Sequence, residues 1–153
     1  QVCSMNEQLL VDGGTWAVDG SDFDCRQPKF LSDIVNSQDP RIELARGLDH
    51  YFVFEQADKT QTQATLFDPE SGRRLRVKTD QPCTVLYTHN YPGVEHFRGG
   101  VIGRQYDSLC IETQKCPHQT CENGDHPARL LPSEQYRHSC TYAFDVANDI
   151  LGE

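Results

Sequence analysis

Two carboxylates carry the clearest acid–base chemistry that this sequence offers. Glu112 lies in the middle of residues 108–114, a short apolar and β-branched run, and Asp49 precedes an aromatic run that starts at Tyr51. Partial burial raises the pKa of a carboxylate towards the range in which it acts as a general base, and a second carboxylate accepts hydrogen bonds from sugar hydroxyls. The competing interpretation places Glu112 on an edge strand with its side chain in water.

Four metal-capable side chains lie close together in the sequence: Cys116, His118, Cys121 and His126. Their spacing matches none of the usual paired-cysteine and paired-histidine frameworks of zinc sites, so we expect no metal. A local disulfide between Cys116 and Cys121 and the absence of any bond between them are equally compatible with the spacing.

A cysteine nucleophile needs a histidine beside it, and His138 with Cys140 is the one close pair. In a strand the two side chains would share a face, but contact alone does not create a nucleophile. The sequence has no G-x-S-x-G motif, no P-loop and no dinucleotide-binding fingerprint. We therefore expect no cofactor.

The composition restricts the classes of partner. The 153 residues suffice for about one domain, and the net charge of −9 argues against nucleic acids and anionic membrane surfaces, which are held by clustered Lys and Arg. No apolar run approaches the length of a membrane span, so we expect no membrane partner. The seven cysteines permit an oxidising compartment without proving it, and a chain that begins at Gln1 suggests a processed or incomplete product.

The pattern of short β-rich segments between turn formers predicts the elements that must position these residues. We expect a short helix over residues 29–35, a hairpin between 51–55 and 62–67, and a loop over 90–106. The expected strands are residues 8–11, 15–18, 51–55, 62–67, 74–79, 83–88, 108–114 and 136–145. Their pattern favours an all-β fold, an antiparallel β-sandwich that forms one domain over residues 1–153.

Five segments together resemble the C-terminal half of the galactose mutarotase (aldose 1-epimerase) family, in the family's order. They are residues 47–50, 68–73, 81–90, 110–114 and 130–136, which include the sequences Gly-Leu-Asp-His and Cys-Ile-Glu-Thr-Gln. The resemblance implies that residues 1–153 are part of a larger domain, the mutarotase-like supersandwich. It also implies a monosaccharide partner, a hexose such as galactose or glucose.

The same resemblance implies roles for individual residues. Glu112 matches the family's catalytic base, which removes the proton of the anomeric hydroxyl, and Asp49 matches the residue that binds sugar hydroxyls. Gln114 and His89 are assigned to substrate binding. The family's acid, a histidine that protonates the ring oxygen, lies upstream of the first residue of this chain, so a missing N-terminal half or a complementary chain would have to supply it.

Local departures from the family pattern affect three positions. Cys83 replaces a usual small Gly, His89 stands where the family often has Gly, and His118 falls where Asp is common. His89 and His118 are the nearest substitutes for a pocket histidine.

Three functional interpretations follow. The leading one is a mutarotase with Glu112 as base, and the alternative is a non-catalytic carbohydrate-binding or interaction protein of the same fold. A third is a small secreted β protein that is stabilised by disulfides and binds no sugar. The resemblance implies a cytoplasmic location, whereas the cysteine content is compatible with an extracellular one.

Overall fold

The computed structural model describes residues 1–94, 96–116 and 128–152, which form eight strands and two short helices. The strands are β1 (Val2–Met5), β2 (Val11–Trp16), β3 (Asp49–Val53), β4 (Ala64–Phe67), β5 (Arg73–Thr79), β6 (Cys83–Tyr87), β7 (Cys110–Gln114) and β8 (Cys140–Val146). The helices are α1 (Leu31–Val35) and α2 (Pro40–Ala45). None of the described helices is long and apolar enough to cross a membrane.

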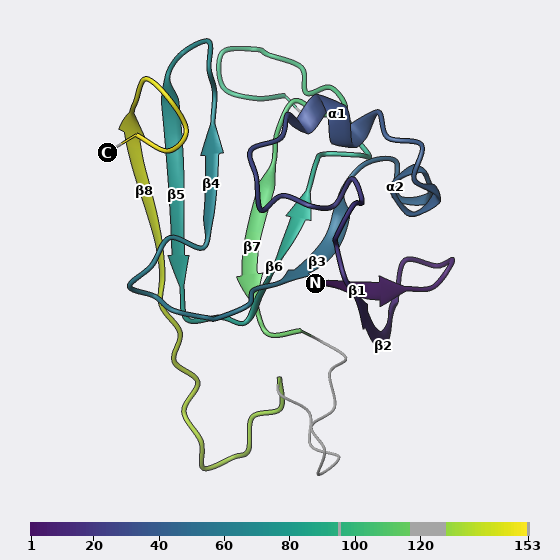
Figure 1. The fold of residues 1–153 in the computed structure, drawn as a ribbon, viewed down its shortest axis with the longest axis vertical. Coiled ribbons are helices and arrows are strands. Elements are labelled where there is room, and N and C mark those ends of the chain that lie inside the picture. The colour runs from purple at the N-terminus through teal and green to yellow at the C-terminus, as the bar shows by residue number, and fades with distance from the viewer. Residues whose placement is uncertain (95, 117–127, 153) are drawn as a thin grey trace.

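The strands form two antiparallel sheets that Figure 1 shows beside each other. The larger sheet has the order β2-β1-β3-β6-β7, and the smaller has the order β4-β5-β8. The hydroxyl of Tyr142 on β8 donates a hydrogen bond to the carbonyl of Ile111 on β7 at 2.8 Å, which joins the edge strands of the two sheets. The prediction of an all-β, antiparallel β-sandwich is confirmed.

The predicted hairpin between residues 51–55 and 62–67 is wrong. β3 pairs with β1 and β6 in the larger sheet, whereas β4 pairs with β5 in the smaller one. The β4–β5 connection is a tight turn, in which the Gly72 N–H donates to the Asp68 carbonyl at 2.8 Å. A short turn of this kind fixes the pairing of its two flanking strands, so β4 pairs forward along the chain.

The structure also shifts several predicted boundaries. The two N-terminal strands begin earlier than predicted, because residues 8–10 belong to the turn between them and Leu9 has a φ of 60°. Helix α1 confirms the predicted helix over a shorter range, and β8 starts at Cys140 instead of residue 136.

Helix α2 was not predicted, although its start signals are in the sequence. Asp39 caps the helix by accepting a hydrogen bond from the Arg41 N–H at 3.0 Å, and Pro40 occupies the first turn. Arg46 ends the helix in the left-handed conformation, with a φ of 57°. The six residues of α2 show too little apolar periodicity to stand out from a loop.

Residues 18–48 cover one face of the larger sheet. Their apolar side chains form a buried cluster with Val2 of β1, and Phe52 and Leu86 pack against this cluster from β3 and β6. The other members of the cluster are Val18, Phe23, Ile34, Ile42 and Leu48. The guanidinium of Arg41 lies 3.7 Å from the ring centroid of Trp16 and closes the cluster towards solvent.

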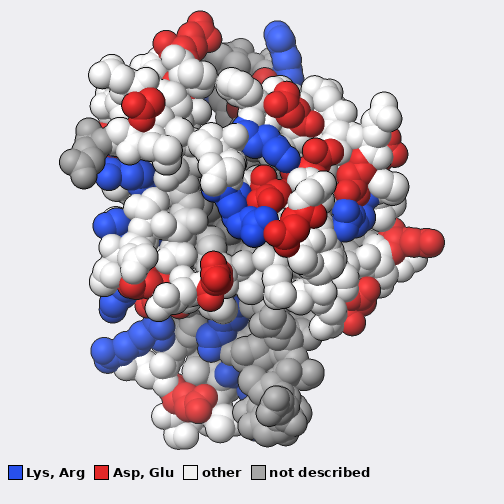
Figure 2. All heavy atoms as spheres, in the orientation of Figure 1, with Lys and Arg blue, Asp and Glu red and all other residues white. Residues whose placement is uncertain are grey.

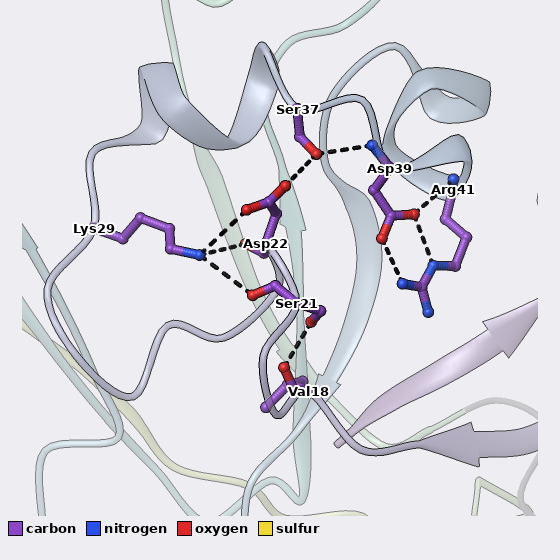
Figure 3. Close-up of polar contacts among 7 residues, drawn as sticks. All are labelled: Val18, Ser21, Asp22, Lys29, Ser37, Asp39 and Arg41. Carbon is purple, nitrogen blue, oxygen red and sulfur yellow. Dashed lines mark hydrogen bonds and ion pairs between the residues drawn. The ribbon is translucent and has the colours of Figure 1, made fainter.

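Polar contacts hold this covering segment together, as Figure 3 shows. Asp22 accepts a hydrogen bond from the Ser37 hydroxyl and lies 3.7 Å from the Lys29 ammonium. The Ser37 oxygen in turn accepts from the Asp39 N–H at 2.9 Å, so the turn around Asp22 is linked to the cap of α2. These contacts are largely exposed, so we assign the stability of the segment mainly to its apolar core.

His50 is a core residue of the larger sheet. It is 2% exposed, its ring lies 4.7 Å from that of Phe23 in an edge-to-face arrangement, and its Nδ1 accepts from the Asp49 N–H at 3.1 Å. Its Nε2 has no hydrogen-bond partner among the described residues. Burial, together with the nearby Arg41, lowers the pKa of His50 to about 4.

We predict that His50 makes the fold acid-sensitive. In the unfolded chain His50 binds a proton near pH 6.5, whereas in the folded chain it does so only near pH 4. The free energy of unfolding is therefore unaffected by His50 above pH 6.5 and decreases as the pH drops towards 4. The loss from this residue is at most about 3 kcal/mol. Urea unfolding at pH 4.5 and 7.5 should therefore show a smaller pH effect in His50→Gln than in the unchanged chain. His96→Gln, at an exposed position, is the control; equal pH effects in all three proteins would contradict the prediction.

Candidate functional site

The pairing of β3, β6 and β7 places the two candidate carboxylates on one face of the larger sheet. Tyr51 lies opposite Val85, and Val85 lies opposite Glu112. Asp49 lies opposite Tyr87, two residues along from the first row. Directly paired residues, and residues two apart on a strand, point to the same face. Asp49 and Glu112 therefore share a face, and the core that contains His50 lies on the other.

The two carboxylates lie on the outer two of three neighbouring strands, β3 and β7, with β6 between them. From the spacing between strands and the rise per residue, the Cα atoms of Asp49 and Glu112 lie about 12 Å apart. Val85, 5% exposed, forms an apolar floor between them, and Tyr51 and Tyr87 are half-buried beside it. Neither tyrosine was predicted as a site residue, although the alternation of side chains along β3 and β6 places both on the face of Asp49.

Burial and charge both act on Asp49. Its side chain is half-buried, and the pKa of its carboxyl is raised by burial and, to a lesser extent, by the negative charge of Glu112. The pKa of the Tyr51 hydroxyl is also raised, by burial and then by Asp49. Glu112 lies exposed on the edge strand β7, the position that the competing interpretation expects. The two carboxylates therefore differ in environment, one half-buried and one in contact with solvent.

A buried hydrogen-bond network fixes the start of β3 and thus the position of Asp49. The Leu48 N–H donates to the Thr88 hydroxyl at 2.9 Å, and that hydroxyl donates to the Asn90 side-chain carbonyl at 2.6 Å. The Asn90 amide donates to the carbonyls of Ala45 and Leu48 at 2.7 and 2.8 Å. Gly47 has a φ of 135° and packs so closely on Asn90 and Thr88 that a Cβ would overlap them, which explains the glycine.

The two further residues predicted to bind substrate, Gln114 and His89, lie in different surroundings. Gln114 lies on β7 on the same face as Glu112, opposite Cys83, and its amide donates weakly to the Glu112 carbonyl at 3.4 Å. His89 follows β6, is buried, and has a φ of 54°. A left-handed conformation favours glycine, which accounts for the Gly that the resemblance implies at this position. The His89 ring lies 6.5 Å from that of Phe97.

Other sequence candidates fall into two groups. His138 and Cys140 do not share a strand face, because β8 begins at Cys140; the His138 ring instead stacks on Tyr136, 5.9 Å away. His118, Cys121 and His126 lie outside the described residues, and with them the metal and local-disulfide alternatives. Among the residues of known placement, no group of three or more His, Cys, Asp or Glu is arranged to hold a metal ion.

Two open hollows lie elsewhere on the surface. One, of about 580 Å³, lies between α1, α2 and the loop at Gln105 and Tyr106. The other, of about 370 Å³, is lined by Lys115 and by residues 129–130 and 134–137. Neither is lined by Asp49 or Glu112. We place the candidate site on the carboxylate face because it alone of these three combines acid–base groups with partial burial. Figure 2 shows Asp and Glu mixed with Lys and Arg on the side of α1 and α2, in line with the Asp22–Lys29 and Asp39–Arg41 ion pairs.

Comparisons with known proteins agree on one family. A family model described as aldose 1-epimerase matches residues 1–143. The galactose mutarotases of Mus musculus and Homo sapiens are 33% and 31% identical over 144 residues, 94% of this chain and 41% of each relative. The solved structure of galactose 1-epimerase from Lactobacillus acidophilus NCFM matches with a TM-score of 0.77 and 31% identity, over 95% of this chain and 41% of that one. The chain thus spans less than half the length of these relatives.

We predict that the negative charge of Glu112 raises the pKa of Asp49 across β6. Glu112→Gln removes one negative charge, so the pKa of Asp49 should fall, while remaining above its ordinary value because burial persists. An NMR titration of the side-chain carboxyl carbons measures this shift. Glu70→Gln, in the turn between β4 and β5, should leave the Asp49 titration unchanged. An unchanged Asp49 titration in Glu112→Gln would show that the two groups do not share the face.

Proposed function

The chain belongs to the aldose 1-epimerase family, as its resemblance predicted, and from this we propose that the complete protein interconverts the α and β anomers of a hexose. By complete protein we mean this chain together with the segment that supplies the rest of the family's fold. Galactose and glucose are the proposed substrates. The observation that carries the proposal is the common face of Asp49 and Glu112.

In the proposed mechanism Glu112 is the general base. Its exposed carboxylate removes the proton of the anomeric hydroxyl, the bond between the anomeric carbon and the ring oxygen breaks, and a proton is delivered to that oxygen. The open-chain aldehyde rotates and closes to give the other anomer. Asp49, held half-buried by the network at Asn90, accepts hydrogen bonds from sugar hydroxyls and orients the ring over Val85, and Gln114 and His89 are further proposed contacts.

We further propose that a segment outside this chain supplies the acid. The adjacent histidine, His50, faces the core and is fixed in its neutral form at neutral pH. Strand β8 also carries exposed apolar side chains. Phe144 and Val146 are 78% and 77% exposed, and the nearby Tyr142 is about half-exposed. Exposed apolar rows of this kind mark surfaces that bind another segment. The coverage of 41% of the relatives' length supports the same proposal.

Polarimetry on freshly dissolved α-D-galactose and α-D-glucose tests the catalytic assignment in the complete protein. Glu112→Gln should lower kcat by about 10²- to 10⁴-fold, the usual contribution of a general base. Asp49→Asn should mainly raise KM, because it weakens hydroxyl binding. Glu70→Gln, far from the face, is the matched control. A Glu112→Gln protein that equilibrates the sugar at the full rate would eliminate Glu112 as the base.

The second candidate is a carbohydrate-binding protein that catalyses no reaction. The core-facing position of His50 favours it for this chain alone, because the face then presents acceptors without a neighbouring acid. Proton NMR of galactose distinguishes the two: binding broadens the sugar signals, and catalysis also accelerates exchange between the anomers. Binding with unaltered anomer exchange by the complete protein would support this second candidate.

A further inference from the structure

Three cysteine thiols meet beside the candidate site, on the same face of the larger sheet. Cys3, Cys83 and Cys116 are each at most 1% exposed and form one buried cluster with Val11. The Sγ atoms of Cys3 and Cys116 lie 2.9 Å apart, about 0.9 Å longer than a disulfide bond. This contact joins residues 113 positions apart in the sequence. Neither the separation nor any local spacing reveals it, so only the fold brings these sulfur atoms together.

The topology explains how the contact arises. Cys3 lies on β1, which is separated from β7 by β3 and β6, and Cys116 lies two residues beyond the end of β7. Tyr51 and Val53 of β3 pack against the thiol cluster, so the cluster lies on the same face as Asp49 and Glu112. Residues 115–116 therefore lead from the end of β7 over this face to β1.

We propose that Cys3 and Cys116 form a disulfide when the chain folds in an oxidising environment. A small-molecule disulfide such as oxidised glutathione is the oxidant. One cysteine thiolate attacks it and releases one glutathione thiolate, and the second cysteine thiolate then attacks the mixed disulfide and releases the other. Two protein thiols lose two protons and two electrons, and the small disulfide gains both to become two thiols.

Cys83 is the alternative partner for a disulfide with Cys116, and the geometry disfavours it. Its thiol donates a hydrogen bond to the Gln114 carbonyl at 3.1 Å and also interacts with the Cys116 thiol, whereas the Sγ atoms of Cys3 and Cys116 lie 2.9 Å apart. Cys3 and Cys116 also close a much longer loop than Cys83 with Cys116, and a longer loop restricts the unfolded chain more strongly.

Burial decides when the bond forms. It raises the pKa of the Cys3 thiol, and raises that of Cys83 to about 12. The three thiols of the cluster are at most 1% exposed, so an external disulfide cannot reach them in the folded chain. The attack therefore takes place during folding, before the cluster closes. Once formed, the bond is shielded from external thiols by the same burial.

Oxidative refolding tests the proposal. The reduced, denatured chain is refolded in reduced and oxidised glutathione, and its remaining thiols are then blocked. Digestion without reductant and mass spectrometry should give a peptide pair linked through Cys3 and Cys116. The oxidised chain should have a higher urea midpoint than the same chain with tris(2-carboxyethyl)phosphine present throughout, and Cys3→Ser should abolish both the linked pair and the difference in midpoint.

Cys25→Ser, which removes an exposed cysteine, is the matched control and should keep the linked pair and the higher midpoint. Seven blocked thiols, or a dominant linkage of Cys116 to Cys83 or Cys121, would overturn the proposal. The peptide map of the unaltered chain decides the matter even if Cys3→Ser fails to fold. Neither readout depends on sugar chemistry, so the outcome is independent of the proposed function.

Discussion

The register of β3, β6 and β7 is the constraint on which the candidate site depends. Because side chains alternate between the faces of a strand, one pairing arrangement sends Asp49, Tyr51 and Glu112 to one face and His50 and Phe52 to the other. The apolar cluster around Phe23 accepts only the second group. Packing on the core side therefore decides which side chains are available on the site side.

The site face is built in two halves with different surroundings. At one end the thiol cluster, with residues 115–116, covers the strands, and at the other end Asp49 and Tyr87 remain half-buried. Glu112 lies between these ends on an edge strand. Asp49 is half-buried and Glu112 is exposed two strands away, so the pKa of Asp49 is raised first by burial and then by the charge of Glu112.

The sequence carried enough information for most strands and for the family, but not for how the strands pair. Alternating β-branched and aromatic residues revealed the strands around Tyr51 and Val85, since this pattern is local. The partner of β3 depends on packing between distant segments, so the expected hairpin with residues 62–67 was wrong. The contact of Cys3 with Cys116 and the left-handed backbone at His89 were equally beyond local reasoning. The roles of Asp49, Glu112, Gln114 and His89 stay predictions.

The alternation of Asp49 and the buried His50 along β3 disfavours pairing of this strand in the wrong register. A slip of β3 by one residue against β6 would exchange the two faces of the strand, and the Asp49 carboxylate would then enter the apolar cluster in place of the imidazole. An unpaired carboxylate there is far costlier than a neutral imidazole, and Phe52 would lose its packing. The free-energy cost of burying the Asp49 carboxylate therefore disfavours the shifted register and favours the register in which Asp49 lies on the site face. In every correctly folded chain the Asp49 carboxylate is therefore already positioned to accept hydrogen bonds.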